Sequence, residues 1–577
     1  MYQKLHKIEK IFFDISAVAL LLFYSYSSVV APAATQFHRG IYVIATYILV
    51  FLLYRSKSTI MRVVDYLLIV LSTATIGYWM FNFEVINYRT GAETDLDMAV
   101  AVVGVLVGVE LARRVVGIVF VIIGAVMLLY GVYGDVMPDL ISHAGDTFPQ
   151  LCTSIFYKSD GVFGIMANVL ATYILLFVFF GAFLNKCGAQ KFFVDFPLAA
   201  VGHKVGGPAK VSVIASGLFG SISGSAIANT VSTGSFTIPM MKKAGFKPHI
   251  AGGIEPAASI GGMFMPPIMG AGGFIMAELT GVPYSQIMLV AIFPAMMYFF
   301  SVFVMVHYEA KKHNLVGEKS EQSATEILKR EWYYIMPLVV ITIFMLYGYS
   351  PGYSAILGII SCIVVSWFRT ETRIGPKEFL EAARDGAESS LKIGATVGVI
   401  GIIIGVLTFS GLVLTFADIV IELADGSLVL TILFIALASL ILGMGVPVTA
   451  AYLITAVVAV PALTHLGVNV IAAHMIVYWL SQDSNITPPV CIAAFAGATI
   501  AKANMWKTAF SAFKFAKFLY LGPFLFGYVP AFSLDGSAMD IVKAFILIIL
   551  GTWAYSWLLS GIWWGSVKKL FGGKAAA

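Results

Sequence analysis

The stretch SIGGMFMPP at residues 259–267 returns in altered form as SQDSNITPP at residues 481–489, 222 positions later. Each version begins with a serine and ends with a double proline. The same offset aligns a proline and a glycine upstream: Pro239 with Pro461, and Gly245 with Gly467. A double proline at equal spacing from a proline and a glycine is hard to obtain by chance. We therefore predict an internal repeat, with copies at about 205–285 and 427–507.

The lysines indicate that the two copies are inverted. Lys242, Lys243 and Lys247 follow the proline of copy one, whereas the equivalent stretch 464–469 carries no Lys or Arg. After the double proline the pattern reverses, because 280–285 is uncharged and four lysines follow copy two. Lys and Arg mark cytoplasmic loops, so the copies point in opposite directions. Inverted repeats with interrupted helices are typical of secondary transporters.

The composition is that of a polytopic membrane protein. The 577 residues are 59% hydrophobic and only 12% charged, with a mean hydropathy of +0.90. These values exclude a soluble domain and a disordered chain. A net charge of +5, spread over short loops, gives no surface for nucleic acid. The four cysteines lie far apart, without the spacing of a zinc site.

The basic residues also predict the orientation in the membrane. Arg55, Lys57 and Arg62 lie between the second and third apolar segments, whereas the connection 83–97 is rich in acids. Both the N-terminus and the C-terminus, near Lys568 and Lys569, are therefore expected in the cytoplasm. The first apolar segments are 11–31, 41–54, 63–82, 98–112, 115–134 and 164–184.

We expect an all-α fold in three parts. Residues 1–136 form a small membrane block of four or five helices, residues 137–163 a polar connecting segment, and residues 164–577 a large transport block that contains the repeats. Each copy has two breaks. The first is GSISGSAIANT at 220–230 and LGMGVPVTA at 442–450, which suits the tip of a re-entrant hairpin.

The second break in each copy, at the double proline, predicts a site for a hard cation. A proline has no N–H and clashes with the preceding turn, so it leaves carbonyls without partners. Carbonyls, hydroxyls and one carboxylate form an all-oxygen environment suited to sodium. Asp483 is the sharpest candidate, because an ionisable group at membrane depth is costly. Glu255, followed by Pro256, is weaker, since it is expected near the cytoplasmic end, where water can solvate it.

The other positions at the breaks are candidates for the substrate region. The opposed half-helix N-termini favour an anionic group there. With Glu255, these positions are Ser221, Thr230, Met265, Pro266, Thr487 and Pro488.

Motifs of soluble and metal-dependent enzymes are absent from the sequence. There is no GxxxxGK[ST] phosphate loop and no HExxH, and GSISG at 220–224 has Ile at its centre where a nucleophile elbow has Ser. An intramembrane serine protease is an alternative from another class, but the serines at 221–225 cannot be paired with a particular histidine. We therefore expect a protein that is not an enzyme.

At these residues the chain resembles the fused membrane subunits of a TRAP transporter (tripartite ATP-independent periplasmic transporter), most closely the TAXI branch. The large block carries the resemblance, and in residues 1–136 only hydropathy and position support it. The motifs are GSISGSAIANTVSTGSFTIPMMKKAGF at 220–246, GGMFMPPIMGAGGFIMAE at 261–278, GMGVPVTAAYLITAVVAVPAL at 443–463 and SNITPPVCIAAFAGA at 484–498.

This resemblance implies a sodium-coupled importer of the bacterial inner membrane that works as an elevator. It also implies a TAXI-type extracytoplasmic binding protein as partner, and a carboxylate substrate such as glutamate, 2-oxoglutarate or another C4–C5 dicarboxylate. By motif position, one sodium site would comprise Ser223, Ser225, Asn229, Gly261 and Gly262. The other would comprise Gly443, Thr449, Asp483 and Ser484. A carrier that is proton-coupled or needs no binding protein remains the alternative within transport.

Overall fold

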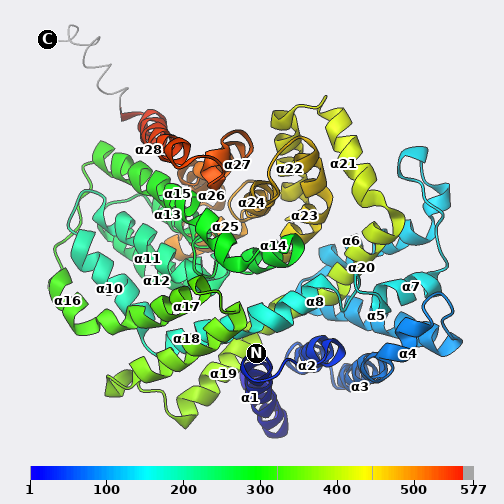
Figure 1. The fold of residues 1–577 in the computed structure, drawn as a ribbon. Coiled ribbons are helices and arrows are strands. Elements are labelled where there is room, and N and C mark those ends of the chain that lie inside the picture. Colours follow the sequence, from blue (N-terminus) through cyan, green and yellow to red (C-terminus); the bar gives the residue numbers. More distant parts are fainter. Residues whose placement is uncertain (1, 57, 321, 445, 563–577) are drawn as a thin grey trace, which may run out of the picture.

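The computed structural model describes residues 2–56, 58–320, 322–444 and 446–562, and it confirms the all-α class (Figure 1). Within these ranges, one isolated bridge between Val205 and Val316 is the only β-type pairing. Eight of the described helices are long and apolar enough to cross a membrane. Lys568 and Lys569, on which the inside placement of the C-terminus depends, lie outside the described residues.

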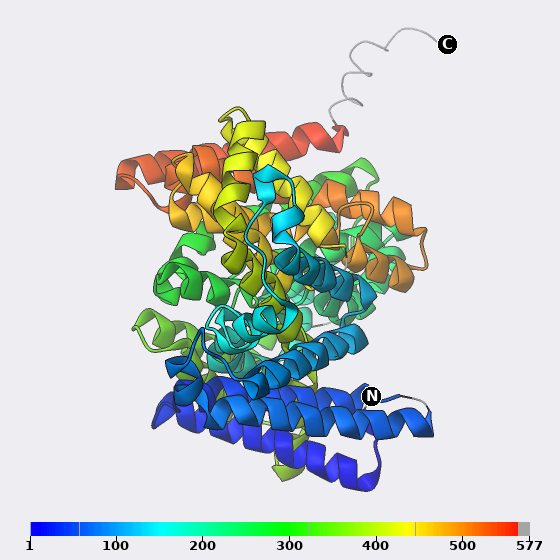
Figure 2. The same cartoon turned by 90° about the vertical axis from the view of Figure 1, so that its right-hand side faces the viewer.

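Each apolar segment predicted within residues 1–136 corresponds to a helix, with differences of a few residues at the ends. Figure 2 shows the first three side by side at the bottom of the molecule. Two ion pairs join their ends, Arg55 to Glu9 at 3.2 Å and Arg114 to Asp65 at 2.5 Å. The helices are α1 (Lys7–Val29), α2 (Thr35–Leu53), α3 (Thr59–Phe81), the short α4 (Phe83–Tyr88), α5 (Asp95–Val115) and α6 (Ile118–Val132).

The connecting segment contains a buried helix, α7 (Phe148–Tyr157), which packs against α5 and α20. It buries the apolar side chains Leu151, Ile155 and Phe156. The chain then enters α8 (Ile165–Val169), a π-helical turn (Leu170–Ile174), α9 (Leu175–Lys186) and α10 (Ala189–Val201).

The first four helices of copy one recur in the same order in copy two, and the long fifth helix, α15, is matched by two helices, α26 and α27. Both bounds of α12 and α23 differ by 222. Copy one comprises α11 (Gly207–Ser223), α12 (Ala226–Lys243), α13 (Pro248–Gly261), α14 (Gly272–Thr280) and α15 (Tyr284–Lys312). Copy two comprises α22 (Leu428–Leu442), α23 (Val448–His465), α24 (Val470–Ser481), α25 (Ile492–Ala501), α26 (Met505–Phe515) and α27 (Phe518–Tyr528).

The copies interlock through the short helices that follow their double prolines. Helix α14 of copy one packs on α23 and α24 of copy two, and α25 of copy two packs on α12 and α13 of copy one. The four breaks are therefore enclosed by elements from both copies.

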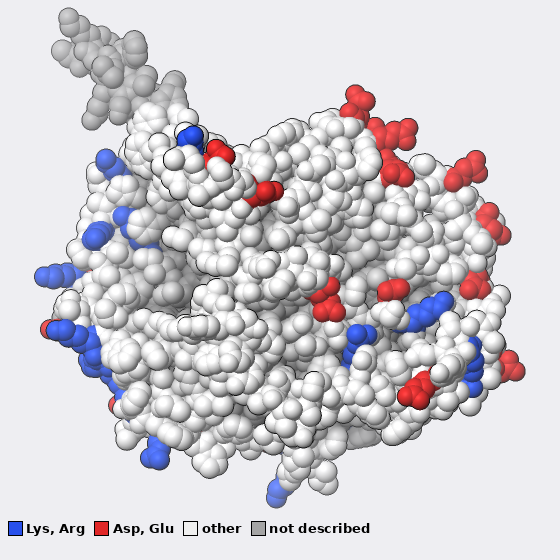
Figure 3. Space-filling model, viewed as in Figure 1, with Lys and Arg blue, Asp and Glu red and all other residues white. Residues whose placement is uncertain are grey.

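The remaining helices surround this centre. Helix α19 packs on α1 and α9, and α20 packs on α5 and α6, so the N-terminal helices lie against this pair. Figure 3 shows a broad face with few charged side chains, bordered by Lys and Arg on the left and by Asp and Glu at the upper right, as expected for a membrane-embedded belt. The remaining helices outside the two copies are α16 (Ala324–Glu331), α17 (Met336–Leu346), α18 (Pro351–Ser366), α19 (Pro376–Gly394), α20 (Val397–Ser410), α21 (Leu412–Leu423) and α28 (Ala538–Ser560).

Candidate functional site

The first hairpin turns at Gly224, between α11 and α12. Gly224 has a φ of 63°, in the left-handed region that glycine adopts without steric cost. Ser223 donates a hydrogen bond to the Ser225 carbonyl at 3.4 Å, and the Ser225 side chain caps α12 by accepting from the Ala228 N–H at 3.3 Å. Both predicted serines therefore lie at the tip.

The hairpin meets the first broken helix through backbone contact between glycines. A Cβ atom added to Gly262 would lie 2.4 Å from the Cα of Gly220, which is closer than real Cβ atoms approach. Asn229 is fully buried beside this contact and donates to the Ser216 carbonyl at 2.9 Å. A Cβ atom added to Gly261 would instead meet the rings of Tyr298 and Phe299 on α15. Of the first predicted site, Asn229 and Gly262 come together here.

Two tyrosine hydroxyls bond to backbone carbonyls around the first double proline, and one of these carbonyls, that of Met263, lies upstream of the prolines, where we predicted cation ligands. Tyr284 donates its hydroxyl to the Pro267 and Ile268 carbonyls at 2.8 and 2.6 Å. Tyr478, on α24 of copy two, donates to the Met263 and Met269 carbonyls at 2.8 and 2.6 Å. Sequence reasoning missed both tyrosines, since their partners are separated from them in the chain. Both hydroxyls satisfy backbone acceptors in copy one, and that of Tyr478 also joins the two copies.

The second hairpin approaches its own broken helix at Gly443 and Ser484. A Cβ atom added to Gly443 would lie 2.4 Å from the Ser484 Cβ. Asp483 is 3% exposed, and its Oδ1 atom has no hydrogen-bond partner among the described residues. Thr449 lies in the first turn of α23 and is half-buried. Of the second predicted site, Gly443 and Ser484 thus come together, and the neighbouring Asp483 has a buried carboxylate oxygen with free acceptor capacity.

Further buried polar atoms without a partner among the described residues lie on the same helices of copy two. Ser439 is on α22, Thr455 is on α23, and Gln482 immediately precedes Asp483. A buried polar group without a partner costs free energy, so several on adjoining helices point to a bound species or ordered water.

The structure corrects the placement of Glu255. We expected this carboxylate near water, but it is fully buried in α13. Its oxygens accept hydrogen bonds from four hydroxyls on two neighbouring helices, those of Ser212 and Ser216 on α11 and of Thr233 and Thr237 on α12, and a longer one of 3.5 Å from Ser259 on its own helix. In copy two the equivalent position is Val477, which explains why Thr455, the counterpart of Thr233, has no partner there.

The other substrate-region candidates fall into two groups. Ser221 is buried and donates to the Leu218 carbonyl, and Thr230 is buried without a partner among the described residues. The four remaining positions are half-buried and equivalent between the copies: Met265 with Thr487, and Pro266 with Pro488. Both double-proline loops therefore expose the same two positions.

The alternative of a serine protease has no support at the first hairpin tip. None of the described serines at 221–225 bonds to a histidine, and Ser27 and His38, which do approach each other at 3.4 Å, belong to α1 and α2.

Comparison with known proteins decides the family. A family model described as "Tripartite ATP-independent periplasmic transporter, DctM component" matches residues 103–532, well over half of the chain. The chain belongs to the DctM family of TRAP transporters. It is therefore a multi-pass membrane transport protein and not an enzyme. TRAP permeases work with an extracytoplasmic substrate-binding protein.

Individual relatives of this DctM-family chain are distant. A putative TRAP transporter large permease of Haemophilus influenzae is 26% identical, over 54% of this chain and 74% of the relative. The 2,3-diketo-L-gulonate TRAP transporter large permease YiaN of Escherichia coli is 29% identical, over 29% of this chain and 39% of the relative. The solved structure of the Alcanivorax borkumensis YdaH transporter has a TM-score of 0.44 and 17% identity, covering 78% of this chain and 98% of that one.

Proposed function

We propose that the chain is a sodium-coupled importer of an organic acid. The observation that carries this proposal is Asp483, a buried carboxylate with one oxygen unpartnered among the described residues, beside Ser484 and Gly443. Together with the Ser484 hydroxyl and nearby backbone carbonyls, this carboxylate would supply the all-oxygen ligand set that a hard cation prefers. Sodium would neutralise the buried charge and give its oxygen a partner.

The first predicted sodium site has fewer oxygen atoms free to ligate a cation. Its loop carbonyls accept from tyrosines and Asn229 is hydrogen-bonded, so Ser223 and Ser225 at the tip supply the remaining oxygens. We therefore propose that the second site, with the negative charge of Asp483, couples sodium binding to transport.

The substrate we propose is a C4–C5 dicarboxylate, glutamate or 2-oxoglutarate, taken from a TAXI-type binding protein. Relatives named for organic acids support this proposal, among them a C4-dicarboxylate permease of Rhodobacter capsulatus and the sialic acid permease SiaT of Haemophilus influenzae. The half-exposed positions Met265, Pro266, Thr487 and Pro488 would line the substrate region.

We further propose an elevator in which the interlocked hairpins and broken helices move as one body against α19, α20 and the N-terminal helices. The helices before residue 103, where the family match begins, pack on the large block within one chain, which supports a fused small subunit in the inner membrane.

The test is uptake of labelled glutamate and 2-oxoglutarate into proteoliposomes, with and without an inward sodium gradient and a candidate binding protein. We expect uptake to require both. Asp483→Asn should abolish the sodium dependence, whereas Asp418→Asn, at an exposed position on α21, should leave it intact. Uptake driven equally by a proton gradient without sodium would contradict sodium coupling and favour the proton-coupled alternative.

A further inference from the structure

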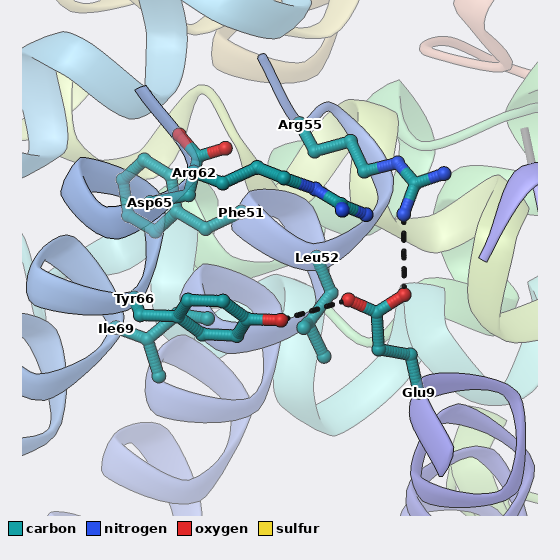
Figure 4. A pocket seen from close by; sticks show the side chains of 8 residues that line it. All are labelled: Glu9, Phe51, Leu52, Arg55, Arg62, Asp65, Tyr66 and Ile69. Atoms are coloured by element: carbon teal, nitrogen blue, oxygen red, sulfur yellow. Dashed lines mark hydrogen bonds and ion pairs between the residues drawn. The ribbon is translucent and has the colours of Figure 1, made fainter. Parts of the chain in front are cut away.

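A hollow outside the transport centre lies between α1, α2 and α3 (Figure 4). It is a surface depression that is open to solvent, and its polar lining comprises Glu9, Arg55, Arg62, Asp65 and Tyr66. Figure 4 shows that the guanidinium groups of Arg55 and Arg62 extend into the same space. Two like charges that face one hollow repel each other unless an anion lies between them.

The two carboxylates of the hollow do not supply this anion for Arg62. Glu9 accepts from Arg55 at 3.2 Å, from the Tyr66 hydroxyl at 3.0 Å and from the His6 N–H at 2.7 Å. Asp65 accepts hydrogen bonds from the Arg114 guanidinium at 2.5 Å and from the Ser56 N–H at 2.9 Å.

The guanidinium N–H donors of Arg62 are therefore not used by either carboxylate of the hollow. The residue is half-buried, and its side chain forms no hydrogen bond or ion pair with any residue that the structure describes. A planar guanidinium matches a phosphate oxygen pair in geometry and charge, which is why arginine is prevalent at phosphate sites.

The helices on either side of the hollow expose apolar side chains. On α3, the exposed fractions of Ile60, Val63 and Leu67 are 79%, 68% and 54%. On α1, those of Ile8 and Ile15 are 81% and 62%. An amphipathic ligand with an anionic head and long apolar chains fits this combination of a basic hollow and apolar flanks.

We propose that this hollow, formed by Arg55, Arg62 and Tyr66 above the apolar faces of α1 and α3, binds the headgroup of an anionic phospholipid. The phosphate lies between the two guanidinium groups, and the acyl chains lie along the exposed helix faces. A zwitterionic lipid binds less well, because its ammonium group is brought close to two arginines whose carboxylate neighbours are already paired.

The test is intact-mass measurement of the purified full-length protein titrated with phosphatidylglycerol or phosphatidylethanolamine. We expect preferential retention of phosphatidylglycerol, and Arg62→Gln should weaken it about fivefold, the effect of one basic residue near a lipid surface. Arg62→Lys should retain most of the binding. Lys7→Gln is the matched control, since it removes one exposed positive charge from the same end of α1.

Three outcomes would overturn the proposal: equal retention of the two lipids, equal losses for Arg62→Gln and Lys7→Gln, or displacement of phosphatidylglycerol by millimolar inorganic phosphate. The last would make the hollow a site for free phosphate. Because the Arg62 side chain has no partner among the described residues, the variant should fold, and gel filtration checks this. Lipid retention is measured without transport, so its result is independent of the proposed function.

Discussion

Two buried carboxylates in the repeat region differ in one respect that decides their roles. Glu255 accepts hydrogen bonds from four hydroxyls, so its charge is compensated within the protein. Asp483 keeps an oxygen without any partner among the described residues. A buried carboxylate that is already saturated has no need of a cation, whereas an unsaturated one gains from binding it. The residue equivalent to Glu255 in copy two is Val477, so only copy one has this internal compensation.

Gly262→Ala is expected to damage the contact between hairpin and broken helix. The new methyl group would lie 2.4 Å from the Gly220 Cα, and a backbone atom cannot move aside as a flexible side chain can. The overpacking should cost about 1–3 kcal/mol, measured as a lower midpoint of thermal unfolding in detergent. Gly181→Ala in α9 is the control, since the nearest atom to its new methyl group is at 3.7 Å. Equal midpoints for the two variants would contradict the close approach.

Sequence reasoning identified Asp483 because an acid among apolar residues is conspicuous without any structure. It could not find Tyr284 or Tyr478, since tyrosines are common in membrane proteins and their role depends on which carbonyls lie within reach. A signal for the environment of Glu255 was present in the sequence. Ser212 and Ser216, and Thr233 and Thr237, are each four residues apart and share a helix face.

At the scale of elements, the Glu255 carboxylate joins three helices. Hydroxyls from α11 and α12 converge on a side chain of α13, so the first hairpin and the first half of the broken helix are bound together at their centre. Such a connection favours movement of these helices as one unit.

Glu255→Gln should therefore lower thermal stability more than the loss of one hydroxyl does. The amide replaces one acceptor oxygen by a donor that faces hydroxyl donors, leaving buried groups unpaired at a cost of about 1–3 kcal/mol each. Thr237→Val, which removes one donor and nearly preserves shape, is the matched comparison. A Thr237→Val midpoint as low as that of Glu255→Gln would argue against a central role for the carboxylate.

Tyr478→Phe tests the link between the copies. The substitution removes the hydroxyl that serves the Met263 and Met269 carbonyls and should destabilise the protein by about 1–3 kcal/mol. Tyr452→Phe, whose hydroxyl bonds to His474 and not to this loop, is the control for losing a buried phenol. We expect sodium to stabilise Tyr478→Phe by a different amount from the wild type in thermal unfolding, whereas the shift for Tyr452→Phe should match the wild type.

The fold was predictable at this scale to the extent that the sequence repeats. Both bounds of α12 recur in α23 at the offset of 222, and each apolar segment predicted within residues 1–136 corresponds to a helix and extends beyond its ends by no more than three residues. The interlocking of α14 and α25 with the opposite copy was not predictable, because it depends on tertiary packing between helices of similar composition.

At the scale of the molecule, the N-terminal helices are held to the large block by specific polar contacts as well as apolar packing. Arg384 on α19 forms a bidentate ion pair with Asp14 on α1, with both distances 2.7 Å. A second pair, Lys186 with Glu381, connects α9 to α19 at 2.7 Å. Helix α19 is thus tied both to the small block and to the first helix of the large one.

A double-mutant cycle of Asp14→Asn and Arg384→Gln should reveal a coupling free energy of about 0.5–3 kcal/mol in thermal unfolding, since both side chains are mostly buried and the geometry is bidentate. The pair Lys243–Glu318 provides the control, because its side chains are 74% and 79% exposed and should couple by about 0–1 kcal/mol. Equal coupling in the two cycles would contradict a special role for the contact with α19.

The packing of α14 and α25 on the opposite copy has a consequence for the synthesis and membrane insertion of the chain. Helices α12 and α13 are complete by residue 261, but α25, which covers them, begins at residue 492. At the usual 5–20 residues per second, the nascent first copy waits roughly 10–50 s for its covering helix. During that interval the face of α12 that later meets α25, at Gly234 and Lys242, has to be shielded by the insertion machinery rather than by the protein itself.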